Sequence, residues 1–281
     1  MKTTRLILLL TSAFIISANS FSQQDTARQA DRTQFKIGIY YNTKLNYYGR
    51  TDNLQSSGAF PLAELWLTHN FYVNAAPVFT NNKVNGFQYA GTIATVGYQF
   101  NRNDRFAGHL YAVKPFYESK SQLVQTALKA QVAANFTWLD KFVNFTIGGD
   151  LKFSDHTDFG GTAGLDHLVR LKLNTHTLLI IDPSVYIYAG TQQFTKTYLN
   201  KSSGFLLLPG GSQLVDQTTR KFNILSYELS LPVIIGVGKI QVVCTPAYVL
   251  PQNLVVVENR PDLSEKGERM LYFTTGIKMA I

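Results

Sequence analysis

The segment Phe142–Phe153, FVNFTIGGDLKF, changes the character of its side chains at every step. One set is apolar or small and comprises Val143, Phe145, Ile147, Gly149, Leu151 and Phe153. The other set is polar or small and comprises Asn144, Thr146, Gly148, Asp150 and Lys152. Successive side chains of an extended chain point to opposite faces, so this period of two predicts a β-strand with one apolar and one polar face.

The same alternation recurs along the chain, for example in Leu165–Asn174 and Leu271–Ile281. Residues 123–138 are ambiguous, because their Ala, Leu, Gln and Lys content favours a helix whereas alternation from Leu128 to Trp138 favours a strand. We predict a strand there and keep the helix as the alternative. The predicted all-β fold has about twelve strands, at 35–48, 59–68, 71–80, 87–100, 105–118, 123–138, 142–154, 163–174, 178–192, 219–235, 239–250 and 269–281.

The connections between these strands fall into two classes. Short ones recur at every second junction, at 69–70, 101–104, 139–141, 175–177 and 236–238. The junctions between them are mostly longer, notably 155–162, 193–218 and 251–268. Short turns at one end and long loops at the other are typical of an antiparallel up-and-down transmembrane β-barrel. An even number of strands also places both termini at the short-turn end.

Strand length and composition narrow the fold class. Most predicted strands run roughly 10–16 residues, whereas globular proteins use about 5–6 and a bilayer crossing needs about 9–11. Only 16% of the 281 residues are charged and 13% are aromatic, which argues against disorder and simple coiled coils. The alternative fold is a soluble periplasmic β-sandwich, in which the apolar faces pack against each other.

The N-terminus has the order of a secretory signal. Lys2 and Arg5 precede the apolar run 6–16, and small residues follow at Ala18, Ser20 and Ser22. We therefore expect a cleaved signal peptide at 1–22, a short polar lead at 23–34 and a single β-barrel domain at 35–281. Removing the signal lowers the formal net charge from +8 to +6, since it carries two positive charges and no negative one.

The last eight residues, TTGIKMAI, carry the one recognisable motif. A polar residue, a glycine two positions later, and hydrophobic residues three and five positions after that glycine fall at Thr274, Gly276, Met279 and Ile281. This spacing resembles the C-terminal assembly signal of Gram-negative outer-membrane β-barrel proteins, although that class usually ends in an aromatic residue. The resemblance is to the class and to no particular family. It implies residence in the cell outer membrane and contact with outer-membrane lipid.

In such a barrel the polar faces line the lumen. The predicted lumen-lining residues carry both signs and are Glu64, His109, Lys129, Asp150, Lys152, Asp166, Arg170, Lys172, Asp182 and Glu228. They form either a stabilising internal network or an aqueous path with weak ion selectivity. Lys114 falls on an outward face beside Pro115, and Pro183 falls within a strand, so we expect bulges near both prolines.

Aromatic residues cluster near the predicted short turns. They are Phe71, Tyr98, Phe100, Phe106, Trp138 and Phe142. A membrane barrel would use them as an interfacial girdle, and the alternative is that they are ordinary hairpin aromatics. Cys244 is the sole cysteine, which excludes an internal disulfide, and its apolar neighbours predict a buried, unreactive thiol.

No motif points to catalysis, a cofactor, a metal or a nucleic acid. The G-x-S-x-G pattern of a serine hydrolase is missing from the sequence, so a membrane-embedded lipid hydrolase is the least favoured hypothesis. The preferred hypothesis is a passive or weakly selective channel for small solutes. The alternative is a closed barrel acting as a structural or interaction subunit of a cell-surface assembly, with loop 193–218 and its apolar triplet 206–208 as plug or partner-docking site.

Overall fold

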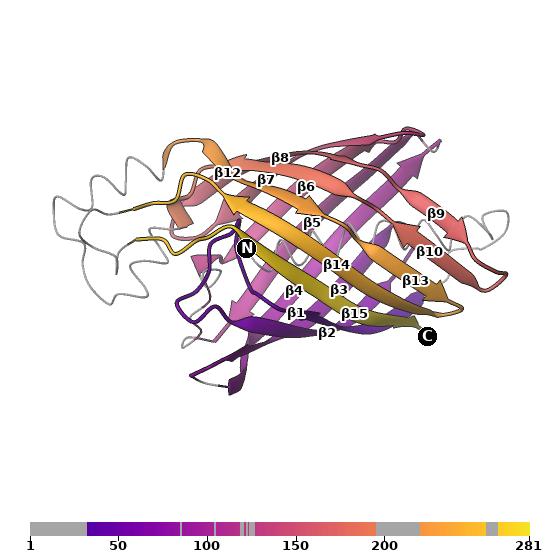
Figure 1. Ribbon diagram of the computed structural model, residues 1–281, viewed down its shortest axis with the longest axis horizontal. Coiled ribbons are helices and arrows are strands. Elements are labelled where there is room, and N and C mark those ends of the chain that lie inside the picture. The colour runs from indigo at the N-terminus through magenta and orange to yellow at the C-terminus, as the bar shows by residue number, and fades with distance from the viewer. Residues whose placement is uncertain are drawn as a thin grey trace.

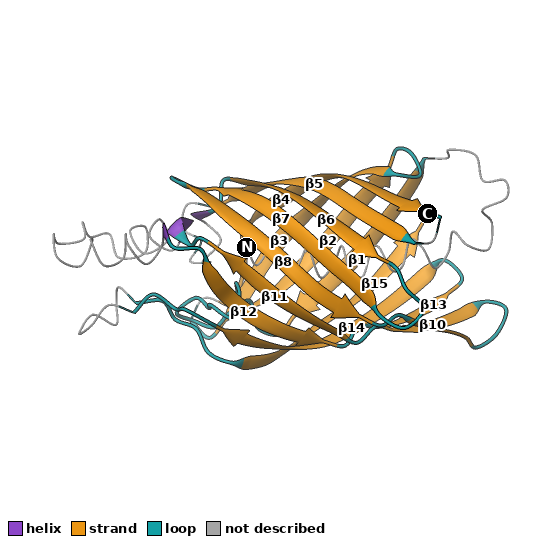
Figure 2. Cartoon of the chain, turned by 90° about the horizontal axis from the view of Figure 1, so that it is seen from above, coloured by secondary structure: helices purple, strands orange, loops and turns teal. Residues whose placement is uncertain are grey.

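The computed structural model describes residues 33–281 except 85, 104, 119–120, 122, 124–126, 195–219 and 257–263. Strands dominate these residues (Figure 2). Their bounds are β1 Gln34–Asn42, β2 Ser57–Trp66, β3 Phe71–Asn82, β4 Gly86–Arg102, β5 Phe106–Tyr117, β6 Ala130–Trp138, β7 Asn144–Phe153, β8 Thr157–Asp166, β9 Val169–Lys172, β10 Thr177–Ile181, β11 Ser184–Gly190, β12 Asn223–Ser230, β13 Val233–Val237, β14 Ile240–Pro251 and β15 Met270–Ala280.

All fifteen described strands belong to one antiparallel sheet that closes on itself. β1 pairs with both β2 and β15, and β12 pairs with β11 on one side and β14 on the other. Three spans are each divided into two pieces, β8 with β9, β10 with β11, and β12 with β13, so the ring contains twelve spans. The predicted up-and-down barrel of about twelve strands is confirmed, and Figure 1 shows its strands inclined to the long axis.

The three divided spans are neighbours, and their breaks lie side by side at 167–168, 182–183 and 231–232. Proline lacks a backbone N–H and interrupts a ladder. One backbone hydrogen bond crosses between neighbouring spans at each of two breaks. The amide of Asp182 donates to the carbonyl oxygen of Pro232 at 3.0 Å, and the amide of His167 donates to the carbonyl oxygen of Pro183 at 3.1 Å. The bulge expected near Pro183 is therefore a break that preserves the alternation of faces.

The bulge expected at Lys114 and Pro115 is wrong. The register of β4 with β5 runs without a shift through Pro115, which faces inward, and Lys114 stays exposed on the outer face. Its ammonium lies 5.9 Å from the centre of the Phe116 ring. Lys114 is three residues from the end of β5, so its long side chain can reach the interface with its charge.

Three predicted strand ends are also wrong. The first strand, predicted at 35–48, ends at Asn42, and residues 43–48 belong to the connection before β2. Leu123 and residues 127–129, the described part of the stretch 123–129, precede β6 and are not in a strand. The predicted long loop 155–162 is instead a tight hairpin, because the alternation of β8 already starts with Asp158 inside and Phe159 outside. The polar and glycine-rich composition of that stretch had suggested a loop.

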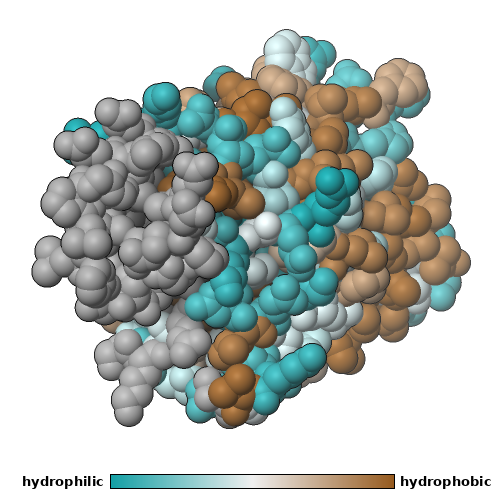
Figure 3. Space-filling view, turned by 60° about the vertical axis from the view of Figure 1, so that its left-hand side comes forward, coloured by the Kyte–Doolittle hydropathy of each residue, from teal (hydrophilic) through white to brown (hydrophobic). Residues whose placement is uncertain are grey.

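The polarity of the two faces is inverted relative to a soluble β-protein. On β15 the outward Leu271 and Ile277 are about half exposed, whereas the inward Tyr272 and Lys278 are buried. Figure 3 shows hydrophobic side chains gathered on the wall, with a hydrophilic zone between them and the long-loop end. Cys244 belongs to the exposed outer face of β14, which corrects its expected burial. Among the described residues, no helix combines the length and the apolar character needed to cross a bilayer.

The two ends of the barrel differ in their connections. The short-turn end comprises the connections 67–70, 103–105, 139–143, 173–176 and 238–239. The long-loop end comprises 43–56, 83–85, 118–129, 154–156, 191–222 and 252–269. Both β1 and β15 reach the short-turn end, where Lys36 pairs with Ala280.

Candidate functional site in the barrel lumen

A buried ion pair inside the lumen joins β2 to β15, the two strands that flank β1 where the ring closes. The ammonium of Lys278 on β15 lies 2.9 Å from the carboxylate of Glu64 on β2, and both side chains are at most 4% exposed. The indole N–H of Trp66 donates to the same carboxylate at 2.6 Å. The ammonium of Lys36, directly across from Glu64 in the ladder, lies 4.6 Å from the centre of the Trp66 ring. These contacts stabilise the closure of the ring.

An aromatic strip continues from this ion pair along the inner wall of β2 to β5. The rings of Trp66 and Tyr72 are 5.0 Å apart, and those of His109 and Tyr111 are stacked at 4.7 Å. Between them, the Tyr72 hydroxyl and the His109 Nε2 form a hydrogen bond of 2.8 Å. The strip gives this side of the lumen a rigid, amphipathic lining.

A second ion pair lies on the inner face of β7. The ammonium of Lys152 is 2.5 Å from the carboxylate of Asp150, and the Gln131 amide donates to Asp150 at 3.0 Å. Gly160 of β8 is the ladder partner of Asp150. A Cβ at Gly160 would lie only 2.1 Å from an Asp150 oxygen and 2.3 Å from the Lys152 ammonium, so only glycine leaves room for this pair.

Three further carboxylates occupy the inner wall where the spans are divided. Asp166 accepts from the Asn144 amide at 2.7 Å, and Glu228 accepts from the Tyr272 hydroxyl at 3.1 Å. Asp182 is 4% exposed and lies next to the break in its span. This sector of the lumen is therefore richer in carboxylates than the rest of the described inner wall.

Segment 43–56 crosses the lumen at the long-loop end. It follows β1, yet the ammonium of Lys152 on β7 lies 5.6 Å from the ring centre of Tyr48. β7 is six spans from β1 in either direction around the ring, so the two strands face each other across the barrel. Most of the segment is buried, which identifies it as an internal constriction.

Arg50 ties this segment to two other connections. Its guanidinium donates to Glu265 at 2.9 Å and to Gln192 at 2.7 Å, and its side chain is 1% exposed. It also donates to four backbone carbonyl oxygens at 3.1–3.4 Å, those of Tyr48, Leu225, Gln252 and Asn253. We call Arg50, Glu265, Gln192 and these carbonyls the Arg50 cluster. A charge with this many partners holds the connections in one arrangement.

Aromatic packing and a carboxylate complete the constriction. Tyr47 packs edge-on against Phe194, with ring centres 4.5 Å apart, and Tyr48 lies 5.3 Å from Tyr188. Burial raises the pKa of the Tyr47 hydroxyl, so the ring remains neutral in this cluster. Asp158 accepts from the backbone amides of residues 193 and 194 at 2.7 and 2.8 Å, which anchors the start of that connection on β8.

The structure places the predicted lumen-lining residues in three settings. On the inner face of the wall lie Glu64, His109, Asp150, Lys152, Asp166, Asp182 and Glu228. Arg170 is half-buried on β9. Lys129 lies at the rim, 62% exposed and 2.8 Å from Asp155, because β6 begins one residue later, and Lys172 is exposed at the end of β9 beside its turn.

The predicted interfacial aromatics all lie at the short-turn end, on or beside β3 to β6. Phe71 faces Tyr98 across the β3–β4 ladder, and Phe106 faces Trp138 across the β5–β6 ladder. Phe100 and Phe142 complete the set, with Phe142 in the 139–143 connection. Together they cover one side of the barrel, and their contact with the membrane interface stays a prediction.

Several charged or polar residues of the site were missed, namely Lys36, Arg50, Asp158, Gln192, Glu265 and Lys278. Lys36 and Lys278 lie on the polar faces of alternating segments, which is a signal that could have found them. Arg50, Gln192 and Glu265 lie in connections, where no periodicity indicates which side chains turn inward. The apolar triplet of loop 193–218 lies outside the described residues.

No protein-family model matches this sequence, and no curated protein matches it. Solved structures do match the fold. A KdgM porin aligns with a TM-score of 0.46 and 6% identity over 87% of this chain and 98% of that chain. LpxR from Salmonella typhimurium aligns with a TM-score of 0.46 and 9% identity over 87% of this chain and 99% of that chain. The COG4313 outer membrane channel from Pseudomonas putida F1 aligns with a TM-score of 0.45 and 10% identity over 92% of this chain and 98% of that chain.

The assignment rests on the chain's own geometry. Its strands pair into a closed ring, its outer wall is largely apolar, and most charged side chains of its strands turn inward. Such a wall is stable where hydrocarbon surrounds it. This chain is therefore a transmembrane β-barrel of the outer-membrane class, with its apolar wall facing lipid.

Proposed function

We propose that this protein is an outer-membrane channel for small polar solutes, and that segment 43–56 narrows its outer mouth. The observation that carries the proposal is the contact of Tyr48 with Lys152 across the ring, above an inner wall that carries charges of both signs. A constriction across a charged lumen is typical of a pore that restricts passage by size.

The ion pairs inside the wall are one observation that supports a conducting role. Burying an ion pair costs desolvation energy, and well-packed apolar residues in its place are often equally stable. A sealed barrel would therefore gain little from Glu64, Lys278, Asp150 and Lys152 inside. Barrels of eight strands are filled by side chains and those of sixteen to eighteen are open, so twelve spans are compatible with a narrow water path.

Selectivity should be weak. The inner wall and the mouth present ammonium and guanidinium groups together with carboxylates, and three oppositely charged pairs of them lie at short distance. Rings of a single sign select ions strongly, whereas paired charges leave a small net field. We expect solute size to matter more than solute charge.

Recordings of purified protein in planar bilayers test the proposal. The wild-type protein should show small conductance steps, and Arg50→Ala should enlarge them or make them more frequent because the constriction loses its anchor. Asp155→Asn, which alters an exposed pair at the rim, is the matched control and should behave as wild type. Absence of steps in all three proteins would exclude a channel and leave the sealed barrel.

The burial of segment 43–56 also suits a second candidate, a closed barrel that serves as an interaction subunit of a surface assembly. In that case a partner would bind the long-loop end, for which residues 193–218 are the sequence-based proposal. Deleting 196–217 should then abolish co-purification of that partner from solubilised outer membrane, while the channel proposal expects no such loss.

A further inference from the structure

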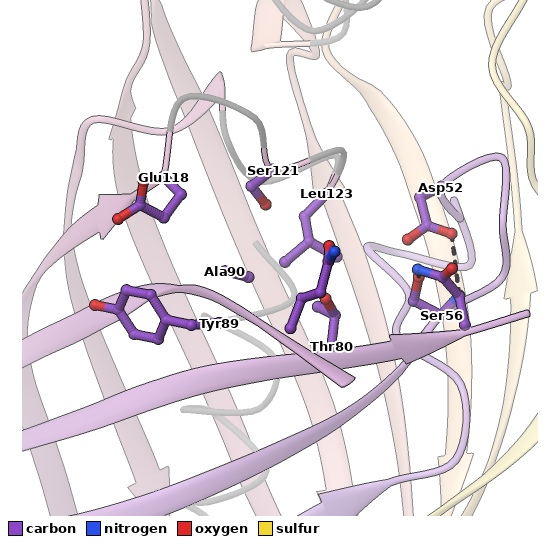
Figure 4. Close-up of a pocket in the computed structure, with 10 residues that line it drawn as sticks. Asp52, Ser56, Thr80, Tyr89, Ala90, Glu118, Ser121 and Leu123 are labelled. Atoms are coloured by element: carbon purple, nitrogen blue, oxygen red, sulfur yellow. Dashed lines mark hydrogen bonds between the residues drawn. The ribbon is translucent and has the colours of Figure 1, made fainter. Parts of the chain in front are cut away.

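A cavity of about 380 Å³ opens at the long-loop end, beside segment 43–56 and apart from the Arg50 cluster. Asp52 and Ser56 line one side, the adjoining ends of β3 and β4 supply Thr80 and Ala90, and the 118–129 connection supplies Ser121 (Figure 4). Its volume lies within the range of small-molecule sites, which is about 300–1,000 Å³.

Asp52 is the fixed charge of this cavity. The residue is 1% exposed, and its Oδ1 accepts from the backbone amides of Leu54 at 3.1 Å and Ser56 at 3.0 Å. Its second oxygen has no hydrogen-bond partner among the described residues, and Figure 4 shows it turned toward the side of Leu123. A buried carboxylate with a free oxygen gains free energy when a donor reaches it.

The remaining lining favours a cation that also donates hydrogen bonds. A second carboxylate, Glu118, lies exposed on the rim. The Ser121 hydroxyl is buried without a partner in the described part of the chain. Ala90 and Leu123 add apolar surface that suits a short hydrocarbon chain.

We propose that this cavity binds a small organic cation, with an ammonium or guanidinium group against Asp52 and its hydrocarbon part over Ala90 and Leu123. A bare metal ion fits less well, since no group of three His, Cys, Asp or Glu in the described residues can hold one. The inference concerns binding alone, so it stands or fails independently of conduction.

Calorimetric titration of the full-length protein in uncharged-lipid nanodiscs tests it, with 1,6-diaminohexane as the probe and 1,6-hexanediol as its neutral counterpart. The diamine should bind and the diol should bind at least about tenfold more weakly, because it lacks the charge that Asp52 attracts. Raising the salt concentration should weaken diamine binding.

Asp52→Asn is the decisive variant. Its side-chain oxygen still accepts from the amides of Leu54 and Ser56, so the turn is kept while the charge is lost, and affinity should fall about tenfold or more. Glu118 is exposed, so Glu118→Gln should lower the affinity for the diamine only about threefold. Asp155→Asn should leave the affinity unchanged. Glu118→Gln and the salt series decide the matter if Asp52→Asn fails to fold.

Three results would overturn the proposal. They are equal binding of diamine and diol, unchanged diamine affinity in a folded Asp52→Asn protein, and calcium binding at the same site that is tighter than the diamine and displaces it. The last result would identify a metal site instead.

Discussion

Two of the three buried ion pairs among the described residues have nearly the same distance and opposite settings. Lys278 with Glu64 and Arg50 with Glu265 are both 2.9 Å apart, and all four side chains are at most 4% exposed. The first pair joins two strands of the wall, whereas the second joins two connections at the mouth. Distance and burial alone therefore do not reveal what an ion pair does. We call Lys278 with Glu64 the wall pair and Arg50 with Glu265 the mouth pair. The wall pair should control the stability of the barrel, and the mouth pair should control access to the lumen.

The largest effect is expected when the wall pair loses one member. Lys278→Met leaves the Glu64 carboxylate buried without its counter-charge, and we expect unfolding in lipid to require about 3–5 kcal/mol less free energy. Urea titration followed by tryptophan fluorescence measures this. The double variant Glu64→Leu with Lys278→Met should recover most of the loss. A single variant as stable as wild type would show that the wall pair does not stabilise closure.

The mouth pair should act locally. Arg50→Ala removes an ion pair and several hydrogen bonds from three connections, each charged bond contributing about 1.5–3 kcal/mol. We expect hydrogen exchange in segment 43–56 to accelerate by about tenfold or more, with little change in β1 or β15. If hydrogen exchange in the wall strands rose as much as in segment 43–56, the mouth pair would stabilise the whole barrel and would not act locally.

Two adjacent glycines sharpen the contrast between inner and outer faces. Gly160→Ala places a methyl group within 2.3 Å of the Asp150–Lys152 pair, whereas the nearest side chain to a Cβ at Gly161 is Phe222 at 3.6 Å. The inner substitution should destabilise the barrel by about 1–3 kcal/mol because of overpacking, and Gly161→Ala should be nearly neutral. Melting curves of both variants in one detergent compare them directly; equal losses would count against a close-packed inner pair.

The smallest effect is expected at the exposed pair of the rim. Lys129 and Asp155 are 2.8 Å apart, but their side chains are 62% and 58% exposed. Surface pairs contribute about 0–1 kcal/mol, so Lys129→Ala should leave both stability and conductance close to wild type. A loss comparable to that of Lys278→Met would mean that solvent exposure does not separate these pairs.

Alternation was the most informative signal for the fold. It predicted the number of spans and the faces of β7 and β15, because a period of two follows from backbone geometry alone. It was less reliable at strand ends, as in residues 123–129 and 155–162, where composition and pattern disagreed. Prolines were also misjudged, since Pro115 fits the inner face without a bulge and Pro183 marks a break.

The site was harder to predict than the wall. Glu64, Asp150 and Lys152 were found because strand parity alone turns them inward. Their partners were not found, since Lys278 is more than two hundred residues from Glu64 in the chain and meets it only when the ring closes. Arg50 gave no signal, because a connection has no periodicity.

The sequence by itself therefore determined a β-barrel with apolar side chains outside and charges inside, since the alternation of side chains is a local property of each strand. Only the tertiary structure decided which charges meet, that segment 43–56 crosses the lumen, and that Asp52 opens into a cavity. These contacts depend on the closure of twelve spans into one ring, which brings β1 opposite β7 and beside β15. The alternation of side chains along each strand does not predict these contacts, because they join segments that are far apart in the sequence.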